Sequence, residues 1–246
     1  MPAFDLPQQP TPFIGREHEI DTLLTLLDDP ACRLLTLVGP GGIGKSRLAL
    51  VLAELSRERY RDGVYFVALQ DWSSPADIVS AIWESIRYQV HTGGDPSKEL
   101  FAFLSARALL LVLDNMEHLL AGGILISELL ASASDVKVLV TSRERLNLLE
   151  ETTFEVSGLP YPMDSELYPT DIDRYSAVQL FAQRARWAYP GFRLAHELSA
   201  VIRICRLTEG MPLALEMAAT WTRVLTCDEI ANEIEHNLDI LELPAR

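Results

Sequence analysis

The residues best suited to bind a phosphate form one glycine-rich segment near the start of the chain. Residues 39–46 are GPGGIGKS and fit the pattern G-x-x-x-x-G-K-[ST]. In such a loop the backbone N–H groups turn toward an anion, and the helix that follows adds the positive end of its dipole. Lys45 would reach the β- and γ-phosphates of a nucleotide, and Ser46 would place its hydroxyl on Mg²⁺. The predicted nucleotide contacts in this loop are Gly41, Gly42, Ile43, Gly44, Lys45, Ser46 and Arg47.

A carboxylate follows an apolar run further along the chain. Residues 109–114 are LLLVLD, and a strand of this kind would present Asp114 at its carboxyl end, where it could hold Mg²⁺ through water. Asn115 cannot accept a proton at neutral pH, so Glu117 is the nearer candidate for a catalytic base or a water-positioning carboxylate. Alternatively, Glu117 and His118 form the capped first turn of the next helix, because Asn followed by Glu is also a helix-start signal.

An arginine follows the next apolar run. Residues 139–143 are LVTSR, which puts Arg143 at the carboxyl end of a neighbouring strand. From there its guanidinium could contact the γ-phosphate and distinguish ATP from ADP. The alternative is a surface arginine that pairs with Glu144 or Glu150.

Short apolar runs alternate with amphipathic segments over the first part of the chain. The apolar runs are 34–38, 63–69, 108–113, 136–141 and 152–156, and the expected helices are 17–27, 46–60, 75–88, 97–106 and 124–133. This alternation predicts an α/β fold with a parallel sheet flanked by helices.

The pattern changes after residue 158, where a connector containing proline and acidic residues leads into purely helical periodicity. The expected helices there are 175–188, 195–207, 212–222 and 228–241. We therefore expect an N-terminal arm (1–12), a nucleotide-binding domain (13–158), a connector (159–174) and a small all-helical subdomain (175–246).

Composition restricts the class of partner. The chain has 246 residues, of which 35 are acidic and 21 basic, giving a net charge of −14. This charge disfavours direct binding to nucleic acid or to an anionic membrane, and no apolar run is long enough to span a bilayer. The three dispersed cysteines show no metal-binding spacing, and the N-terminus shows no secretory signal, so we expect a cytoplasmic protein.

Five motifs in order resemble those of the STAND NTPases, and most closely the AP-ATPase or NB-ARC branch as found in bacterial regulators. The motifs are FIGRE at 13–17, the phosphate loop, LDNMEHL at 113–119, TSRERL at 141–146 and GMPLALE at 210–216. The resemblance covers nearly the whole chain from Phe13 and implies a P-loop NTPase fold.

The resemblance implies roles for further residues. In the family, backbone groups at the positions of Phe13 and Ile14 contact the adenine edge, with Arg16 alongside. Pro212 packs on the base or ribose, although a proline at the first position of a helix is also expected after Gly210 for reasons of local structure alone. Arg143 is similar to the family's sensor arginine.

The implied activity is that of a switch. ADP keeps the module closed, exchange for ATP permits self-association in the full-length protein, and hydrolysis of ATP resets it. Many family members have a second acidic residue where this chain has Asn115, so we expect slow hydrolysis. The family's winged-helix, effector and sensor domains are not in this chain, so we expect a part of a longer protein whose inducer is unknown.

Three other functions are consistent with a phosphate loop. A metabolite or nucleotide kinase is the main alternative, although the chain shows no arginine-rich lid. A GTPase lacks support because no N-K-x-D guanine-recognition motif is present. A scaffold with a permanently bound nucleotide is the third.

Overall fold

The computed structural model describes residues 6–87, 95–163 and 172–236. By contacts the chain divides into two units. The first comprises residues 1–11, 17–41 and 45–156, and the second comprises residues 12–16, 42–44 and 157–246. Each unit has its own apolar core.

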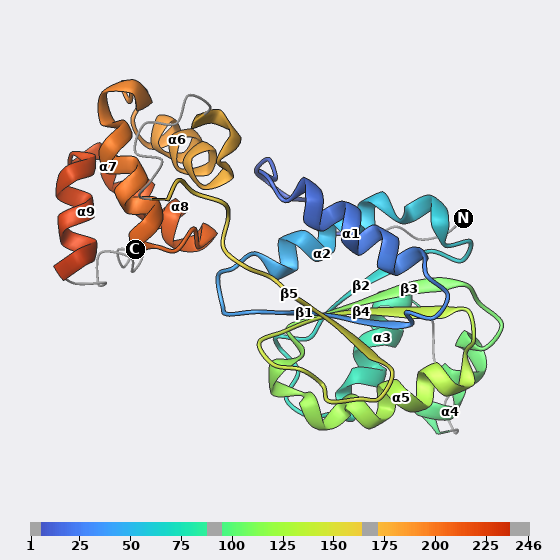
Figure 1. The fold of residues 1–246 in the computed structure, drawn as a ribbon. Coiled ribbons are helices and arrows are strands. Elements are labelled where there is room, and N and C mark those ends of the chain that lie inside the picture. Colours follow the sequence, from blue (N-terminus) through green and yellow to red (C-terminus); the bar gives the residue numbers. More distant parts are fainter. Residues whose placement is uncertain (1–5, 88–94, 164–171, 237–246) are drawn as a thin grey trace. The chain divides into compact units, whose positions relative to one another are not determined.

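The first unit is built on a five-stranded parallel sheet with the order β2-β3-β4-β1-β5 (Figure 1). The strands are β1 (Leu34–Val38), β2 (Val64–Ala68), β3 (Leu109–Asp114), β4 (Val136–Ser142) and β5 (Glu151–Glu155). Every residue of β3 is buried, as expected for a central strand covered on both faces. Because all strands run in parallel, their carboxyl ends lie at one edge of the sheet.

Helices cover both faces of this sheet (Figure 1). One face carries α1 (Glu17–Asp28) and α2 (Lys45–Leu55), and the other carries α3 (Asp77–Ile86), α4 (Pro96–Leu104) and α5 (Gly123–Ser132). The face covered by α3, α4 and α5 holds an apolar cluster, in which Leu111 and Val138 of the central strands pack with Ile82, Leu104 and Leu129 of the helices. Burying each of these side chains contributes about 1.5–3 kcal/mol to the stability of the fold. The core therefore holds in place the strands that end at Asp114 and just before Arg143.

The second unit is helical. Its α-helices are α6 (Ser176–Ala188), α7 (Leu194–Leu207), α8 (Pro212–Thr220) and α9 (Cys227–His236). Phe181 of α6 is fully buried in their shared core. The turn between α7 and α8 requires glycine at position 210, because its φ is +66° and an added Cβ would lie 2.1 Å from the carbonyl oxygen of Leu159.

Several helix ends differ from the expectation. The helix expected over 46–60 ends at Leu55, after which Ser56 is buried and Arg57–Arg59 form a 3-10 turn. Tyr60 is buried beyond that turn, so the apolar periodicity continues where the α-helix does not.

Other expected helices also differ at an end, or are described only in part. The helix expected over 75–88 begins at Asp77 and ends at Ile86, and Tyr88 lies outside the described residues. The helix expected over 212–222 ends at Thr220 and is followed by a 3-10 turn. For the helix expected over 228–241, only the part up to His236 is described.

Candidate functional site

The glycine-rich loop connects β1 to α2, as its sequence predicts. Gly42 and Gly44 have φ values of +81° and +95°, a region that glycine enters at no steric cost. Lys45 begins α2, and its ammonium donates hydrogen bonds to the carbonyl oxygens of Gly39 at 2.8 Å and Pro40 at 3.0 Å. The lysine side chain therefore folds back over the first part of the loop.

The electrostatic surroundings of Lys45 come from the neighbouring strand ends. Burial lowers the pKa of Lys45 below its ordinary value, and the residue is only 8% exposed. Glu117 acts against this shift, Arg143 adds to it, and Asp114 acts against it. These four charged side chains, which the sequence suggested as catalytic, are therefore close enough within the first unit to influence one another.

Asp114 ends β3 with a carboxylate that is hydrogen-bonded inside the protein. The hydroxyl of Thr141, on the adjacent strand β4, donates to Asp114 Oδ1 at 2.6 Å. The backbone N–H of Asn115 donates to the same hydroxyl at 3.0 Å. Sequence reasoning assigned no role to Thr141, although it stands in the motif that contains Arg143; a hydroxyl residue at the carboxyl end of a central strand was the available signal.

Arg143 forms an ion pair with Glu117. Its Nε lies 3.2 Å from Glu117 Oε1, and its guanidinium lies against the loop, since a Cβ added to Gly41 would be 3.4 Å from Arg143 Nη2. The alternative pairing of Arg143 with Glu144 or Glu150 is not found; the carboxylate of Glu150 accepts from the hydroxyl of Ser127 instead.

Glu117 lies in a 3-10 turn, Met116–His118, rather than in the first turn of an α-helix. Asn115, which precedes the turn, is in the left-handed region with φ +65° and ψ +51°. The chain therefore bends sharply directly after Asp114. This bend brings Glu117 back toward Lys45 and Arg143.

The first turn of α2 carries the other two loop residues of the first unit. Ser46 is partly buried beside Lys45. Arg47 points to the N-terminal arm, where it donates to the side-chain oxygen of Gln9 at 3.2 Å and to the carbonyl oxygen of Thr11 at 2.8 Å. The side chain of Arg47 therefore holds the arm, a contact that the motif did not predict.

The remaining residues that the resemblance assigned to nucleotide binding lie in the second unit. Arg16 is 4% exposed and donates to the carbonyl oxygens of Ile43 at 2.8 Å and Ser157 at 2.9 Å. The ring of Pro212 faces Gly44, with its Cγ 3.9 Å from the position of an added Cβ. Phe13 and Ile14 are partly buried in the same unit. Arg16 thus supports the tip of the loop through backbone contacts.

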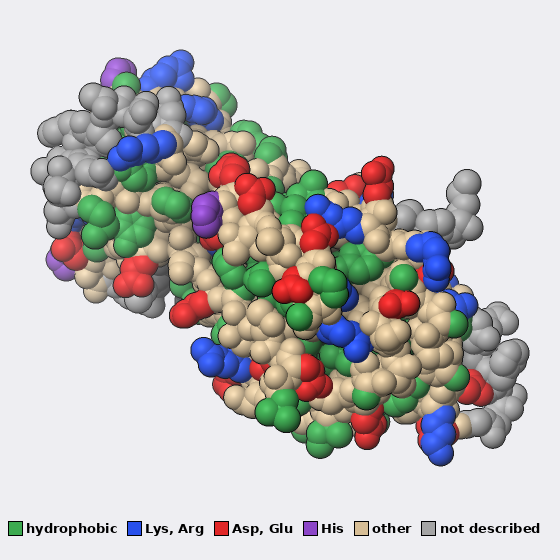
Figure 2. Space-filling model, turned by 45° about the vertical axis from the view of Figure 1, so that its right-hand side comes forward, with side chains coloured by type: hydrophobic (Ala, Val, Ile, Leu, Met, Phe, Trp, Pro, Cys, Tyr) green, Lys and Arg blue, Asp and Glu red, His purple; other side chains and the backbone are tan. Residues whose placement is uncertain are grey.

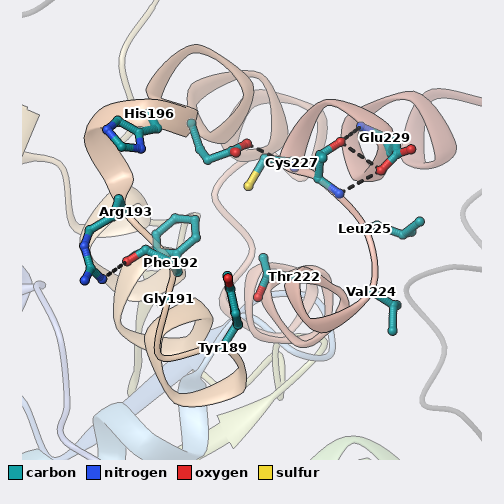
Figure 3. Close-up of a pocket in the computed structure, with 12 residues that line it drawn as sticks. Tyr189, Gly191, Phe192, Arg193, His196, Thr222, Val224, Leu225, Cys227 and Glu229 are labelled. Atoms are coloured by element: carbon teal, nitrogen blue, oxygen red, sulfur yellow. Dashed lines mark hydrogen bonds between the residues drawn. The ribbon is translucent and has the colours of Figure 1, made fainter.

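A separate hollow of about 310 Å³ lies in the helical unit, beside the starts of α7 and α9 (Figure 3). Its polar groups bind one another: Glu197 accepts from the backbone N–H of Cys227 at 3.2 Å, and Glu229 accepts from the backbone N–H of Thr226 at 2.8 Å. None of the predicted site residues lines it. This hollow is therefore not the candidate site.

Charged side chains are mixed over the molecular surface. On the face drawn in Figure 2, Lys and Arg side chains are scattered among Asp and Glu side chains, without a continuous basic patch. Among the residues with described structure, every helix is too short or too polar to cross a bilayer. The same residues contain no group of three or more His, Cys, Asp or Glu side chains placed to hold a metal ion.

The AAA ATPase domain family matches residues 12–98. Together with the five-stranded parallel sheet and the loop between β1 and α2, this match fits an α/β P-loop NTPase fold. In proteins of this fold a glycine-rich loop between a strand and a helix binds phosphate, and residues 39–46 occupy that position here.

The chain is also similar to individual bacterial and archaeal proteins. Over 205 residues the chain is 37% identical to a Mycobacterium tuberculosis protein provisionally named an HTH-type transcriptional regulator, a match covering 82% of this chain and 22% of that protein. A STAND protein with a tetratricopeptide repeat sensor from Pyrococcus horikoshii aligns with a TM-score of 0.53 at 17% identity, over 94% of this chain and 33% of that chain. A Walker-type ATPase of Pyrococcus abyssi aligns with a TM-score of 0.58 at 14% identity, over 91% and 72%. The chain thus spans about a fifth of the mycobacterial relative, and the two archaeal structures share its fold.

Proposed function

We propose that the chain is the ATP- and ADP-binding switch module of a STAND signal-transduction ATPase. The observation that carries the proposal is the gathering of Lys45, Asp114, Glu117 and Arg143 at the carboxyl edge of the parallel sheet, beside the glycine-rich loop. In open α/β sheets, ligands bind outside the carboxyl ends of the strands. Cations beside loop amides provide the local attraction that a polyphosphate needs in a chain of net charge −14.

In this proposal each charged residue has a distinct task. Lys45 binds the β- and γ-phosphates. To do so, its ammonium gives up its hydrogen bonds to the carbonyl oxygens of Gly39 and Pro40. Arg143 contacts the γ-phosphate, which ADP lacks, and Glu117 positions the attacking water. Phe13, Ile14 and Pro212 hold the adenosine part, with Arg16 supporting the loop tip.

Mg²⁺ fits the oxygen ligands present. Ser46 and Asp114 would hold it, and both supply the hard oxygen ligands that Mg²⁺ prefers. The ion typically binds proteins through one or two such side chains, with phosphate and water completing its shell. When bound, it supplies charge neutralisation at the phosphates.

The proposed switch depends on exchange between ADP and ATP. ATP and ADP must bind the two conformations of the switch with different affinities, because equal affinity shifts no equilibrium. We propose that the ATP form self-associates in a longer protein, in response to an inducer received by other domains. The STAND sensor protein and the mycobacterial regulator support this assignment by likeness alone.

Calorimetry on the isolated chain tests the proposal. We expect ADP and ATP to bind with Mg²⁺, GTP to compete poorly, and steady-state turnover to stay below about 10 s⁻¹, the median for enzymes. Lys45→Ala should abolish binding. Lys98→Ala is the matched control, because the Lys98 side chain is 84% exposed. Unchanged ADP affinity in a folded Lys45→Ala variant would refute the site, and transfer of phosphate to a metabolite would indicate a kinase.

A further inference from the structure

The hydroxyl of Thr141 makes two contacts whose directions are fixed. A backbone N–H can only donate, so Thr141 Oγ1 is the acceptor for the N–H of Asn115 at 3.0 Å. The single hydroxyl proton is then directed to Asp114 Oδ1, 2.6 Å away. A hydroxyl bonded to a carboxylate at this distance forms a charge-assisted hydrogen bond.

The position of Thr141 in the sheet explains why this contact exists. Strand β4 lies between β3, which ends in Asp114, and β1, which leads into the glycine-rich loop. Thr141 pairs in register with Leu37 on β1 and contacts Asp114 on its other side. It is 1% exposed, so water does not compete for its hydroxyl.

We propose that Thr141 is a positioning residue that sets the orientation of the Asp114 carboxylate for Mg²⁺. Its hydroxyl occupies Oδ1, which fixes the plane of the carboxylate and leaves Oδ2 with no hydrogen-bond partner among the described residues. Partners behind a metal-binding side chain typically change metal affinity when they are removed. This inference rests on the proposed function, because it assumes that Asp114 serves Mg²⁺ and nucleotide.

A purely structural role would predict a different behaviour. The ends of β3 and β4 are already joined by backbone pairing, which reaches Leu113 and Val140, so the strands do not depend on this hydroxyl to stay together. Thr36 on β1 provides the comparison. It is a fully buried threonine of the same sheet, and its hydroxyl has no hydrogen-bond partner within the described residues.

The test compares Thr141→Val with Thr141→Ser and with the matched control Thr36→Val. Nucleotide binding is measured by calorimetry over a series of Mg²⁺ concentrations and also in EDTA. We expect Thr141→Val to need about tenfold more Mg²⁺ for half-maximal strengthening of ATP binding, with unchanged affinity in EDTA. Thr141→Ser and Thr36→Val should keep the wild-type Mg²⁺ requirement. If the valine variant does not fold, Thr141→Cys, whose thiol is a weak donor, replaces it with the same expectation.

The possible outcomes distinguish failure of the proposed function from failure of the role proposed for Thr141. If the wild-type chain binds no adenine nucleotide, the proposed function and this inference both fail. If the wild type shows Mg²⁺-dependent binding and Thr141→Val retains the same Mg²⁺ requirement, only the inference fails. An equal shift in Thr36→Val would also overturn it, because the effect would then come from loss of any buried hydroxyl in the sheet.

Discussion

Arg143 Nε lies 3.2 Å from Glu117 Oε1, so the residues that follow the two central strands are joined by an ion pair. The Arg143 side chain is 64% exposed and that of Glu117 is 19% exposed. An ion pair this open to water contributes only about 0–1 kcal/mol. A phosphate group could therefore compete with Glu117 for Arg143 at little cost.

Glu117→Gln should strengthen ATP binding. The substitution removes a negative charge beside Lys45 and Arg143, so we expect up to about tenfold tighter binding, or about 1.4 kcal/mol. Hydrolysis should slow at the same time if Glu117 positions water. Calorimetry and phosphate release measure the two effects. Glu144→Gln, at an exposed carboxylate next in sequence to Arg143, is the control, and equal affinity in both variants would contradict the prediction.

Asn115→Ala should destabilise the first unit, and Asn115→Gly should not. Position 115 has φ +65°, where a Cβ costs about 1–2 kcal/mol and where Asn is tolerated better than most residues. Urea unfolding at equilibrium measures the difference. Equal stability of the alanine and glycine variants would show that the backbone after Asp114 is not held in this conformation.

Asp62 should contribute to stability in a pH-dependent way. Its carboxylate accepts from the backbone N–H of Ala108 at 2.8 Å, and this bond is the main cause that holds the pKa of Asp62 below its ordinary value. A carboxyl whose pKa is depressed by folding stabilises the protein above its unfolded-state pKa and loses that contribution as pH falls through the folded-state pKa.

Asp62→Asn should therefore reduce the stability difference between neutral pH and about pH 3, because the ordinary pKa of Asp is about 3.9. Urea unfolding at both pH values provides the measurement, with Asp71→Asn at an exposed carboxylate as the control. The prediction fails if the Asp62 and Asp71 variants lose the same amount of acid sensitivity.

The cysteines of the helical unit should be unreactive until it opens. Cys205 and Cys227 are buried, and desolvation raises the pKa of each thiol to about 12. Iodoacetamide reacts with thiolates, so at about pH 8 we expect no labelling of either residue in the native protein and full labelling in denaturant. Mass spectrometry reports the sites. Rapid native labelling at Cys227 would show that α9 separates readily from α7.

The sequence predicted the phosphate loop, Asp114 and Arg143 at one edge of the sheet because each follows an apolar run directly. A parallel sheet then brings the carboxyl ends of its strands together without further information. The pairing of Arg143 with Glu117 and the contact of Thr141 with Asp114 could not be predicted in this way. Both depend on which strands are neighbours and on side-chain directions that only tertiary packing determines.

Local sequence patterns were less reliable for the end of α2 and for the contacts of Arg47. Tyr60 stays buried after α2 ends, so periodicity alone extended that helix too far. For Arg47, the loop motif predicted a nucleotide contact but gave no indication that the guanidinium would bond to residues 9 and 11 of the arm. The arm has no helix or strand in its described part, so nothing in its composition indicated that it would be held.

The pairing of β5 with β1 determines where the first unit can be cut. Strand β1 is apolar apart from Thr36 and pairs with β5 along its length, and the N–H of Val156 donates to the carbonyl oxygen of Val38 at 2.8 Å. A truncated fragment that stopped after Arg143 would contain Lys45, Asp114, Glu117 and Arg143. It would nevertheless leave one side of β1 with unpaired backbone N–H and C=O groups. Such edges recruit strands from other molecules and precipitate. Soluble expression of this unit should therefore require a C-terminal boundary at or beyond Val156.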